Sequence, residues 1–343
     1  MNWSRGHTLG RGSSATVYAA TSSDSGEMFA VKSTELPQSA LLQREQTILS
    51  TISSPWIVGY KGYDVTRENN IVVFNLMLEY MAGGTLRDGI RRSGGKLGEP
   101  EIVDYTRQIL QGLEYLHSRG IVHCDIKSRN VLLGDGGAKI ADFGCAKQSG
   151  SAAACMGGTP MFMPPETAQG KEQEFPADIW ALGCTVIEMA TGGGSPWPNA
   201  TDPASLLYRI AYSGESPEIP HSLSDQAKDF LEKCLRQNPG DRWTAEKLLN
   251  HPFLLQQARN QNNQIPKESR SSPTSVLDQG IWNSMEGPVR RRAERSMEGL
   301  EDDDSPLGRI RKLCDQSPEK PNGEWDEESW TTVRRDGGEA EKH

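Results

Sequence analysis

The sequence predicts an α+β fold in two lobes, a small strand-rich lobe followed by a larger helical one. Short runs of apolar, β-branched and aromatic residues indicate strands at 16–20, 28–32 and 71–80. Apolar residues at helical spacing then follow at 99–119, and the later segment 178–189 is nearly apolar throughout. Strands in the first part and helices in the second are typical of an α+β protein.

A change in composition near residue 255 is the third observation behind this prediction. Beyond it Gln, Asn, Ser, Pro and charged residues dominate and apolar residues are sparse. Such a composition cannot offset the entropy of ordering, so we expect a mostly disordered regulatory or docking tail at 255–343. The folded domain is expected at 1–254, with the small lobe at about 1–80 and the large lobe at about 85–254. Gly83-Gly84 breaks the chain between them.

A glycine-containing run opens the small lobe. Its residues are Leu9-Gly10-Arg11-Gly12-Ser13-Ser14-Ala15-Thr16-Val17. Glycines allow a hairpin to lie close over phosphate groups and to offer backbone N–H donors to them. The pattern by itself is weak evidence, because many glycine turns have this composition.

A lysine and an acidic residue follow in the small lobe. Lys32 ends a short apolar strand, and the segment 39–51 has helical periodicity with Ser39 as its expected N-cap. Glu45 interrupts the apolar face of this helix, so it should point inward and needs a cation. Lys32 is the expected partner; the alternatives are a solvated Lys32, and Glu35 as the nearer acid in sequence.

The loop His123-Cys124-Asp125-Ile126-Lys127-Ser128-Arg129-Asn130 precedes Asp142-Phe143-Gly144. Transfer of a phosphoryl group needs an acid that orients the attacking hydroxyl, oxygen ligands for a divalent metal, and a cation near the transferred group. Asp125, Asn130, Asp142 and Lys127 are residues of these types. The alternative is a loop of solvated polar residues.

The order and spacing of these two motifs resemble the catalytic and metal-binding loops of eukaryotic protein kinases. The resemblance implies ATP and Mg²⁺ as cofactors, Asp125, Lys127, Lys32 and Glu45 as catalytic residues, and Asn130 and Asp142 as metal ligands. It also implies that Leu78 lies at the back of the adenine pocket. The implied nucleotide-binding residues are Gly10, Arg11, Gly12, Ser13, Ser14, Ala15, Val17, Ala30, Lys32, Glu79, Met81 and Leu132. Ala15 departs from the family pattern, which usually has a third glycine there.

The resemblance extends into the large lobe. Gly158-Thr159-Pro160 resembles the end of a Ser/Thr kinase activation segment, so Thr159 is expected to contact Asp125 and Lys127. The stretch 145–163 is small and polar, and we expect a mobile loop. The resemblance also implies a buried bridge between Glu166 and Arg242. Asp178 is expected to cap its helix and to anchor the catalytic-loop backbone.

Several phrases, among them Gln43-Arg44-Glu45 and Asp142 to Lys147, resemble plant MAP kinase kinase kinases of the MEKK-like class. A segment of the tail around Trp282 resembles the branch linked to abscisic acid and stress. This resemblance implies a serine/threonine kinase that phosphorylates a MAP kinase kinase. The alternatives are a nucleotide-binding scaffold without activity, a Ser/Thr kinase outside that cascade, and an adaptor that acts through its tail.

Cys124 occupies a position where many kinases have an arginine that binds a phosphate on the activation segment. A thiol cannot form the paired, charge-assisted contacts of a guanidinium. We therefore hypothesise that activity depends less on phosphorylation of Ser149 or Ser151 than on abundance, partners or the tail. A redox role for Cys124 and Cys145 is one alternative, and simple packing is the other.

Composition bounds the partners and the compartment. The formal net charge of –9 argues against a general nucleic-acid binder. No apolar run approaches the roughly 20 residues of a membrane span, and no secretory or lipidation signal is expected. Six scattered cysteines indicate neither a disulfide framework nor a zinc site. We expect a cytoplasmic monomer, and the arginines at 290–295 are either a nuclear-import patch or a solvated charge run.

Overall fold

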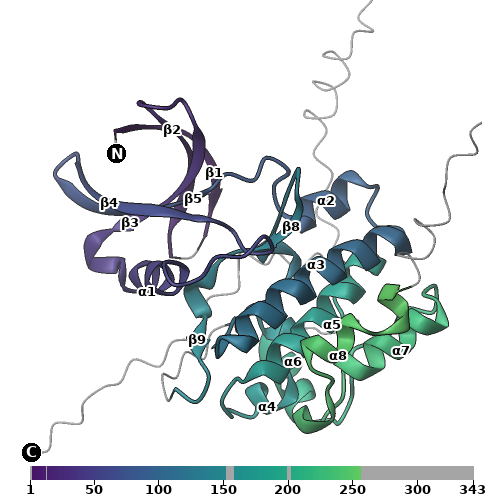
Figure 1. Ribbon diagram of the computed structural model, residues 1–343. Coiled ribbons are helices and arrows are strands. Elements are labelled where there is room, and N and C mark those ends of the chain that lie inside the picture. Colours follow the sequence, from purple (N-terminus) through teal and green to yellow (C-terminus); the bar gives the residue numbers. More distant parts are fainter. Residues whose placement is uncertain (1, 13, 152–157, 199–201, 256–343) are drawn as a thin grey trace, which may run out of the picture. The chain divides into compact units, whose positions relative to one another are not determined.

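The computed structural model of this protein describes residues 2–12, 14–151, 158–198 and 202–255. All of them belong to one compact unit of the chain. Ser13 and the predicted tail from residue 256 onward lie outside the described residues. Within the described part, the strands gather in the first 80 residues and the long helices follow, as the sequence predicted (Figure 1).

The N-terminal lobe is a five-stranded antiparallel sheet with the strand order β1-β2-β3-β5-β4. Its strands are β1 (Trp3–Arg11), β2 (Thr16–Ser22), β3 (Met28–Glu35), β4 (Tyr60–Glu68) and β5 (Ile71–Glu79). The sequence indicated the hairpin of β2 and β3 and the strand β5, but it gave no clear signal for β1 or β4. Polar residues explain this, because β4 turns Asp64 and Glu68 toward β1. There Trp3 Nε1 donates to Asp64 at 3.1 Å, and Arg5 contacts Glu68 at 2.6 Å.

Helix α1 (Ala40–Leu49) packs against this sheet, and a short 3-10 turn, η1 (Leu36–Gln38), leads into it. Leu42 and Leu49 are buried among the apolar side chains of β5, and Glu45 is only 1% exposed. The predicted cap at Ser39 is wrong in one respect. Ser39 occupies the N-cap position, but its hydroxyl donates back to the carbonyl of Leu36 at 2.7 Å instead of capping the helix.

The connection between the lobes is held by backbone hydrogen bonds to the C-terminal lobe. The N–H of Gly83 donates to the carbonyl of Leu133 at 2.9 Å, and the N–H of Leu133 donates to Gly84 at 2.8 Å. A Cβ on Gly83 would lie 2.6 Å from the Leu133 oxygen, so the close approach requires glycine there.

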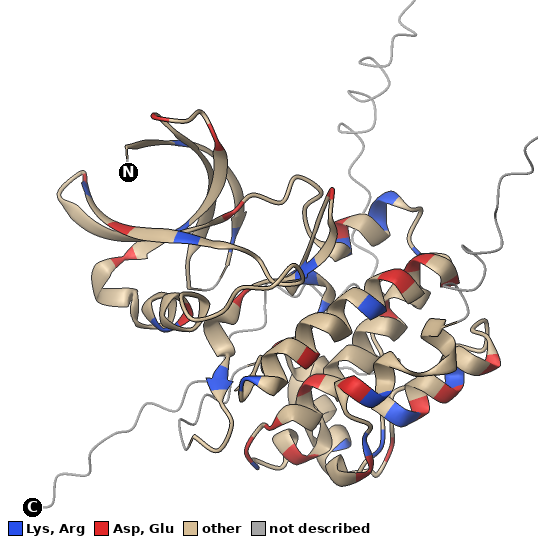
Figure 2. Cartoon of the chain, in the orientation of Figure 1, with Lys and Arg blue, Asp and Glu red and all other residues tan. Residues whose placement is uncertain are grey.

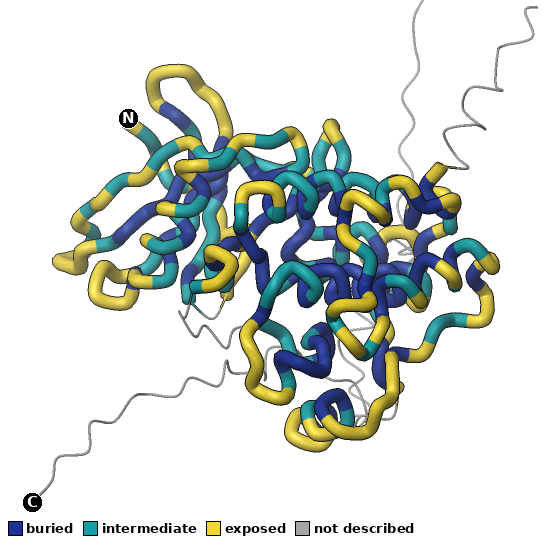
Figure 3. Tube along the Cα trace, turned by 60° about the horizontal axis from the view of Figure 1, so that its bottom comes forward, coloured by how far each residue is buried: buried dark blue, intermediate teal, exposed yellow. Residues whose placement is uncertain are grey.

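The C-terminal lobe is built from helices around the buried helix α5 (Phe175–Thr191). The others are α2 (Leu86–Arg92), α3 (Glu99–Ser118), α4 (Pro165–Ala168), α6 (Pro203–Tyr212), α7 (Asp225–Cys234) and α8 (Ala245–Leu249). Every residue of α5 from Ala177 to Met189 is buried, as its apolar composition predicted. Buried segments gather inside this lobe, whereas its outer loops are exposed (Figure 3).

Two short antiparallel pairs of strands lie between α3 and α4 in the chain. Strand β6 (Ile121–Val122) pairs with β9 (Lys147–Gln148), and β7 (Val131–Gly134) pairs with β8 (Gly137–Ile140). The sequence placed Lys147 and Gln148 in a mobile loop, and this is corrected: they form an edge strand beside the segment that leads into His123. Residues 158–163 of that predicted loop are also described and include a 3-10 turn at Pro160–Phe162, whereas residues 152–157 lie outside the described part.

Short 3-10 turns complete the path of the chain. They are η2 (Ser128–Asn130), η3 (Phe143–Cys145), η4 (Pro160–Phe162) and η5 (Pro239–Asp241). Basic and acidic residues are interspersed along the helices in view (Figure 2). None of the helices in the described part of the chain is both long and apolar enough to cross a membrane.

Candidate active site

Lys32, Glu45 and Asp142 meet where the two lobes face each other. Lys32 Nζ lies 2.7 Å from Glu45 Oε2 and 2.7 Å from Asp142 Oδ1. The second Glu45 oxygen accepts from the N–H of Phe143 at 3.1 Å. Of the two acids that the sequence offered to Lys32, the structure selects Glu45, while Glu35 is exposed. Strand β3, helix α1 and the segment that leads into η3 are thereby joined by one ion-pair cluster, in which Glu45 is buried and Asp142 is exposed.

Electrostatics keep this cluster charged. The Lys32 ammonium lowers the pKa of Asp142 to about 2, although partial removal of the carboxylate from water acts to raise it. Burial acts to lower the pKa of Lys32, but the two carboxylates raise it above its ordinary value. At neutral pH the site therefore offers one fixed cation beside a carboxylate whose side chain is 47% exposed.

A second cluster surrounds Asp125 in the loop after β6. Its Oδ1 accepts from both the N–H and the hydroxyl of Thr159, at 3.1 and 3.0 Å. Its Oδ2 lies 3.0 Å from Lys127 Nζ and accepts from Asn130 Nδ2 at 2.8 Å. Lys127 also donates to Thr159 Oγ1 at 2.5 Å. The predicted contacts of Thr159 with Asp125 and Lys127 are both present.

Asp178, fully buried on α5, anchors the start of this loop. Its Oδ2 accepts from the N–H of His123 at 2.9 Å, and its Oδ1 accepts from the N–H of Cys124 at 2.8 Å. Cys124 has a φ of 66°, a left-handed conformation that costs free energy for a residue with a Cβ. The predicted anchoring role is confirmed, but the predicted cap is wrong. The helix begins at Phe175, so Asp178 lies within its first turn and turns toward the loop.

Glu188 anchors the middle of the same loop, and sequence reasoning missed it. Its Oε1 accepts from Ser128 Oγ at 2.7 Å and lies 3.3 Å from Arg87 Nη1. The signal that could have found it is an acid in an otherwise apolar helix, as for Glu45. Asp178 and Glu188 share one rigid helix, so a single element fixes both parts of the loop.

The residues predicted to contact a nucleotide come from the β1–β2 hairpin, β3, the end of β5, β7 and the connection between the lobes. Gly10, Arg11 and Val17 belong to the β1–β2 hairpin, where Gly10 pairs with Val17 and Arg11 with Thr16. Ser14 and Gly12 are in the turn, and Ser13 lies outside the described residues.

The apolar members of that set share one hydrophobic cluster. Ala15 and Ala30 are buried in it, and Val17 and Leu132 pack against it. Ala30 pairs directly with Leu78 across β3 and β5. These side chains belong to the main hydrophobic core, to which both lobes contribute.

Glu79 ends β5, and Met81 follows in the connection between the lobes. The Glu79 carboxylate contacts Lys139 Nζ at 2.7 and 2.8 Å and accepts from the N–H of Gly59 at 2.9 Å. The Met81 carbonyl accepts from Gly84. Lys139 was not predicted from the sequence to take part, since its partner is 60 residues away.

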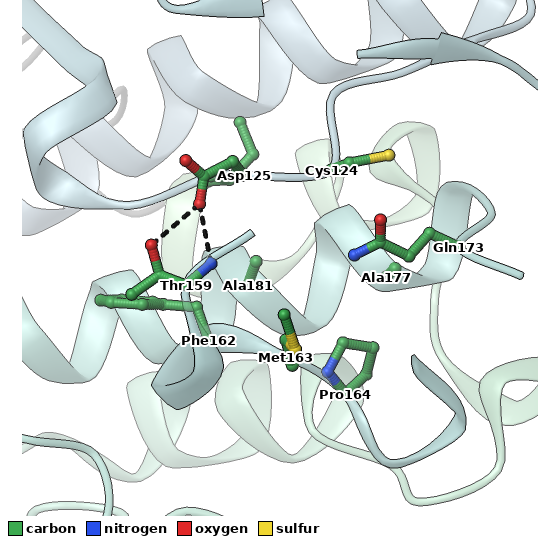
Figure 4. A pocket seen from close by; sticks show the side chains of 10 residues that line it. Cys124, Asp125, Thr159, Phe162, Met163, Pro164, Gln173, Ala177 and Ala181 are labelled. Atoms are coloured by element: carbon green, nitrogen blue, oxygen red, sulfur yellow. Dashed lines mark hydrogen bonds between the residues drawn. The ribbon is translucent and has the colours of Figure 1, made fainter. Parts of the chain in front are cut away.

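A small recess lies beside Asp125. Figure 4 shows Asp125 and Thr159 facing each other at one side of it, and apolar side chains across it. Its lining residues are Cys124, Asp125, Ile126, Thr159, Phe162, Met163, Pro164, Gln173, Ala177 and Ala181. The recess has no room for a group much larger than a water molecule, so it is a packing gap beside the carboxylate.

Asn130 and Asp142 suit a magnesium ion by the chemistry of their donor atoms. Both carry oxygen ligands, and Mg²⁺ is usually held by one or two such side chains together with substrate phosphates and water. In the described part of the chain no group of three His, Cys, Asp or Glu side chains could hold a metal alone. A site completed by nucleotide phosphates fits this donor set, and a closed structural metal site does not.

Comparison with known proteins decides the family. The family model described as "Protein kinase domain" matches residues 3–254. The chain belongs to the protein kinase family. Mitogen-activated protein kinase kinase kinase 18 of Arabidopsis thaliana is 50% identical over 347 residues, 98% of this chain and 100% of that protein.

Further relatives refine the assignment. Mitogen-activated protein kinase kinase kinase 17 of Arabidopsis thaliana is 52% identical over 292 residues, covering 83% of this chain and 78% of the relative. Mitogen-activated protein kinase kinase kinase 20 of the same plant is 37% identical over 357 residues, 97% and 100% of the two chains. The protein is therefore a kinase of the MAP kinase kinase kinase type, in the plant MEKK-like class. The fold and the family predicted from the sequence are both confirmed.

Proposed function

We propose that this kinase transfers the γ-phosphoryl group of ATP to a serine or threonine of a MAP kinase kinase. The observation that carries the acceptor class is the cluster of Asp125, Lys127 and Thr159. Both Thr159 donors contact one Asp125 oxygen, and Lys127 bridges Asp125 and Thr159. A hydroxyl brought to this cluster meets a carboxylate and an ammonium together.

Each residue of the site has a role in this proposal. Asp125 orients the substrate hydroxyl and accepts its proton, and Lys127 offsets the negative charge on the transferred group. Lys32, oriented by Glu45, binds the α- and β-phosphates. Asn130 and Asp142 hold Mg²⁺, which neutralises phosphate charge when bound.

The nucleotide lies between the lobes in this proposal. The Gly10–Val17 hairpin offers N–H groups to the phosphates, and Val17, Ala30 and Leu132 cover the adenine ring. Backbone groups of Glu79 and Met81 bind the adenine edge. The support is the shared apolar cluster and the family membership.

The cellular setting is proposed from the relatives and from sequence resemblance. The named relatives are MAP kinase kinase kinases, whose substrates are MAP kinase kinases. The resemblance of the tail favours a stress or abscisic-acid cascade, with the protein acting as a monomer in the cytoplasm and nucleus. Docking or regulatory proteins would bind the tail, residues 255–343.

The experiment is transfer of label from [γ-³²P]ATP to a panel of catalytically inactive MAP kinase kinases. We expect label on the activation loop of at least one member, and none with Asp142→Asn. Autophosphorylation without labelling of any member would contradict the proposed substrate. Binding of ATP without transfer to any acceptor would contradict the proposed role of the site as a catalyst.

A further inference from the structure

Glu174 joins the start of the activation segment to the helix that positions the catalytic loop. It occupies the N-cap position of α5, four residues before Asp178. Its carboxylate accepts from Ser149 Oγ at 2.5 Å and from the N–H of Gly150 at 3.1 Å. It also lies 3.5 Å from Nζ of Lys147. The Glu174 carboxylate therefore contacts three groups of this segment: the Lys147 ammonium, the Ser149 hydroxyl and the Gly150 amide.

Lys147 depends on this contact because of its burial. Its side chain is 4% exposed, and a buried ammonium is costly unless a carboxylate compensates it. Burial acts to raise the pKa of Glu174, but the hydrogen bonds from Ser149 and Gly150 and the charge of Lys147 lower it overall. The carboxylate is thus ionised at neutral pH and compensates the Lys147 ammonium.

The segment that Glu174 holds is coupled to the catalytic loop by backbone pairing. Lys147 pairs with Val122, and the N–H of Ser149 donates to the carbonyl of Gly120 at 2.7 Å. Strand β6 runs from there directly into His123. Displacement of β9 or of the start of α5 would therefore shift the loop that carries Asp125.

We propose that Glu174 is a positioning residue that takes the place of an activating phosphate, and that phosphorylation of Ser149 releases this contact and lowers activity. The Ser149 hydroxyl is exposed and accessible to a protein kinase. Its oxygen would form a bond to the γ-phosphorus of ATP. The bond from that phosphorus to the β–γ bridging oxygen breaks, ADP leaves, and the hydroxyl proton passes to the base of the modifying kinase.

The expected effect is inhibition because of the charges that surround Ser149. A phosphate carries about –1.5 to –2 charge at neutral pH and would face the Glu174 carboxylate directly. Lys147 is already paired with that carboxylate. Arg119 is the neighbouring cation on the β6 side, and its guanidinium stacks on the Tyr115 ring at 4.5 Å. Cys124 offers a thiol, not a guanidinium, where a phosphate-binding arginine would lie.

The test compares the full chain with and without genetically encoded phosphoserine at position 149. We expect phosphoserine to lower kcat by about tenfold or more, with KM for ATP changed by less than about twofold. Treatment of the same sample with a protein phosphatase should restore the rate, which excludes a misfolded preparation. A phosphorylated protein that is as active as the unmodified one, or more active, overturns the proposal.

Matched variants separate the effect of an added negative charge, the effect of its position, and the role of Glu174. Ser149→Glu should be inhibited and Ser149→Gln should not, because only the first adds charge. Ser151→Glu places the same charge at a hydroxyl that contacts the Gln148 carbonyl, and should keep the wild-type rate. Glu174→Gln alone should also be inhibited, because it removes the carboxylate that compensates the buried Lys147 ammonium. Equal rates for Ser149→Glu and Ser149→Gln would contradict repulsion by Glu174, and a wild-type rate for Glu174→Gln would contradict its positioning role.

A readout at the contact itself distinguishes positioning from general stability. Ser149→Glu should speed hydrogen exchange of the Gly150 amide while the melting temperature stays within a few degrees of that of Ser149→Gln. Exchange unchanged by the added charge would oppose the proposal. The inference rests on the proposed function, so rates are measured on both a MAP kinase kinase and a short serine peptide. Loss of labelling of the first alone would count against the proposed substrate and leave the Ser149 comparison readable on the peptide.

Discussion

At the scale of single residues, the site depends on charges whose partners come from distant parts of the chain. Lys32 and Asp142 are 110 residues apart, and Lys32 and Glu45 are 13 apart. Each residue could be proposed from its motif, since a lysine after a short strand and an acid on an apolar helix face are unusual. Which acid meets Lys32 required the packing of α1 on the sheet, because Glu35 is nearer in sequence.

The choice between these two acids leads to a prediction. Glu45→Gln keeps the size of the side chain but removes the charge that orients Lys32, so kcat/KM should fall by about a hundredfold. The measurement is steady-state transfer to a serine peptide at saturating and limiting ATP. Glu35→Gln, on an exposed position, is the matched control and should match the wild type. A similar loss in both variants would contradict the selective role of Glu45.

At the scale of elements, helix α5 organises the C-terminal lobe. It carries Asp178 and Glu188 toward the catalytic loop, and Glu174 lies just before it. Its apolar composition predicted a central helix, but not where it begins. The helix starts at Phe175 because Glu174 is extended and Pro176 is favoured in a first turn. This start is what turns Asp178 from a cap into an anchor for the loop.

The predicted bridge between Glu166 and Arg242 joins α4 to the segment before α8. The structure contains it, with two contacts at 2.6 and 2.7 Å, and the guanidinium also lies 5.0 Å from the Trp180 ring. The Arg242 side chain is 0% exposed. The planar fork of an arginine satisfies both carboxylate oxygens, which a lysine could not do.

Removal of this arginine should destabilise the fold. Arg242→Met leaves Glu166 buried without its partner, and the free energy of unfolding should fall by about 3–5 kcal/mol. Urea denaturation followed by tryptophan fluorescence measures it. Arg236→Met breaks an exposed pair with Glu232 at 3.8 Å and should cost at most about 1 kcal/mol. Equal costs for the two variants would mean that burial does not set the strength of the bridge.

At the scale of the whole molecule, the described hydrophobic core is contained in the kinase domain. The main cluster of buried residues extends from Ala15 to Leu254, and the family model ends at the same residue, 254. The domain boundary expected from composition at 1–254 stays a prediction until the parts of the chain are separated.

Separation of the tail is therefore the third prediction. A chain that ends at Leu255 should fold with an unchanged melting temperature and phosphorylate a short peptide within about twofold of the full chain, because a domain with its own core folds alone. Its rate on an intact MAP kinase kinase should fall where the tail contributes docking. Thermal unfolding and parallel assays on peptide and protein substrates measure these effects. Unfolding of the shortened chain would place part of the core in residues 256–343.

The sequence by itself determined the fold class, the kinase family and the identity of the charged residues in the cleft. Local patterns indicate those features. They are the spacing of His123 to Asn130, the Asp142-Phe143-Gly144 motif, the helical spacing of apolar residues in α3, and the apolar run of α5. Local propensity and motif chemistry suffice for them, because they depend on neighbours in the chain.

Only the tertiary structure decided the contacts that join distant segments. Strands β1 and β4 escaped prediction because their polar residues are satisfied by each other across the lobe. Glu188, Lys139 and Glu174 escaped because a polar residue acquires its role from the partner that packing brings to it, 60 or 25 positions away. Buried polar groups must be paired. The sequence shows which polar residues need a partner, but only the fold determines which partner each one contacts.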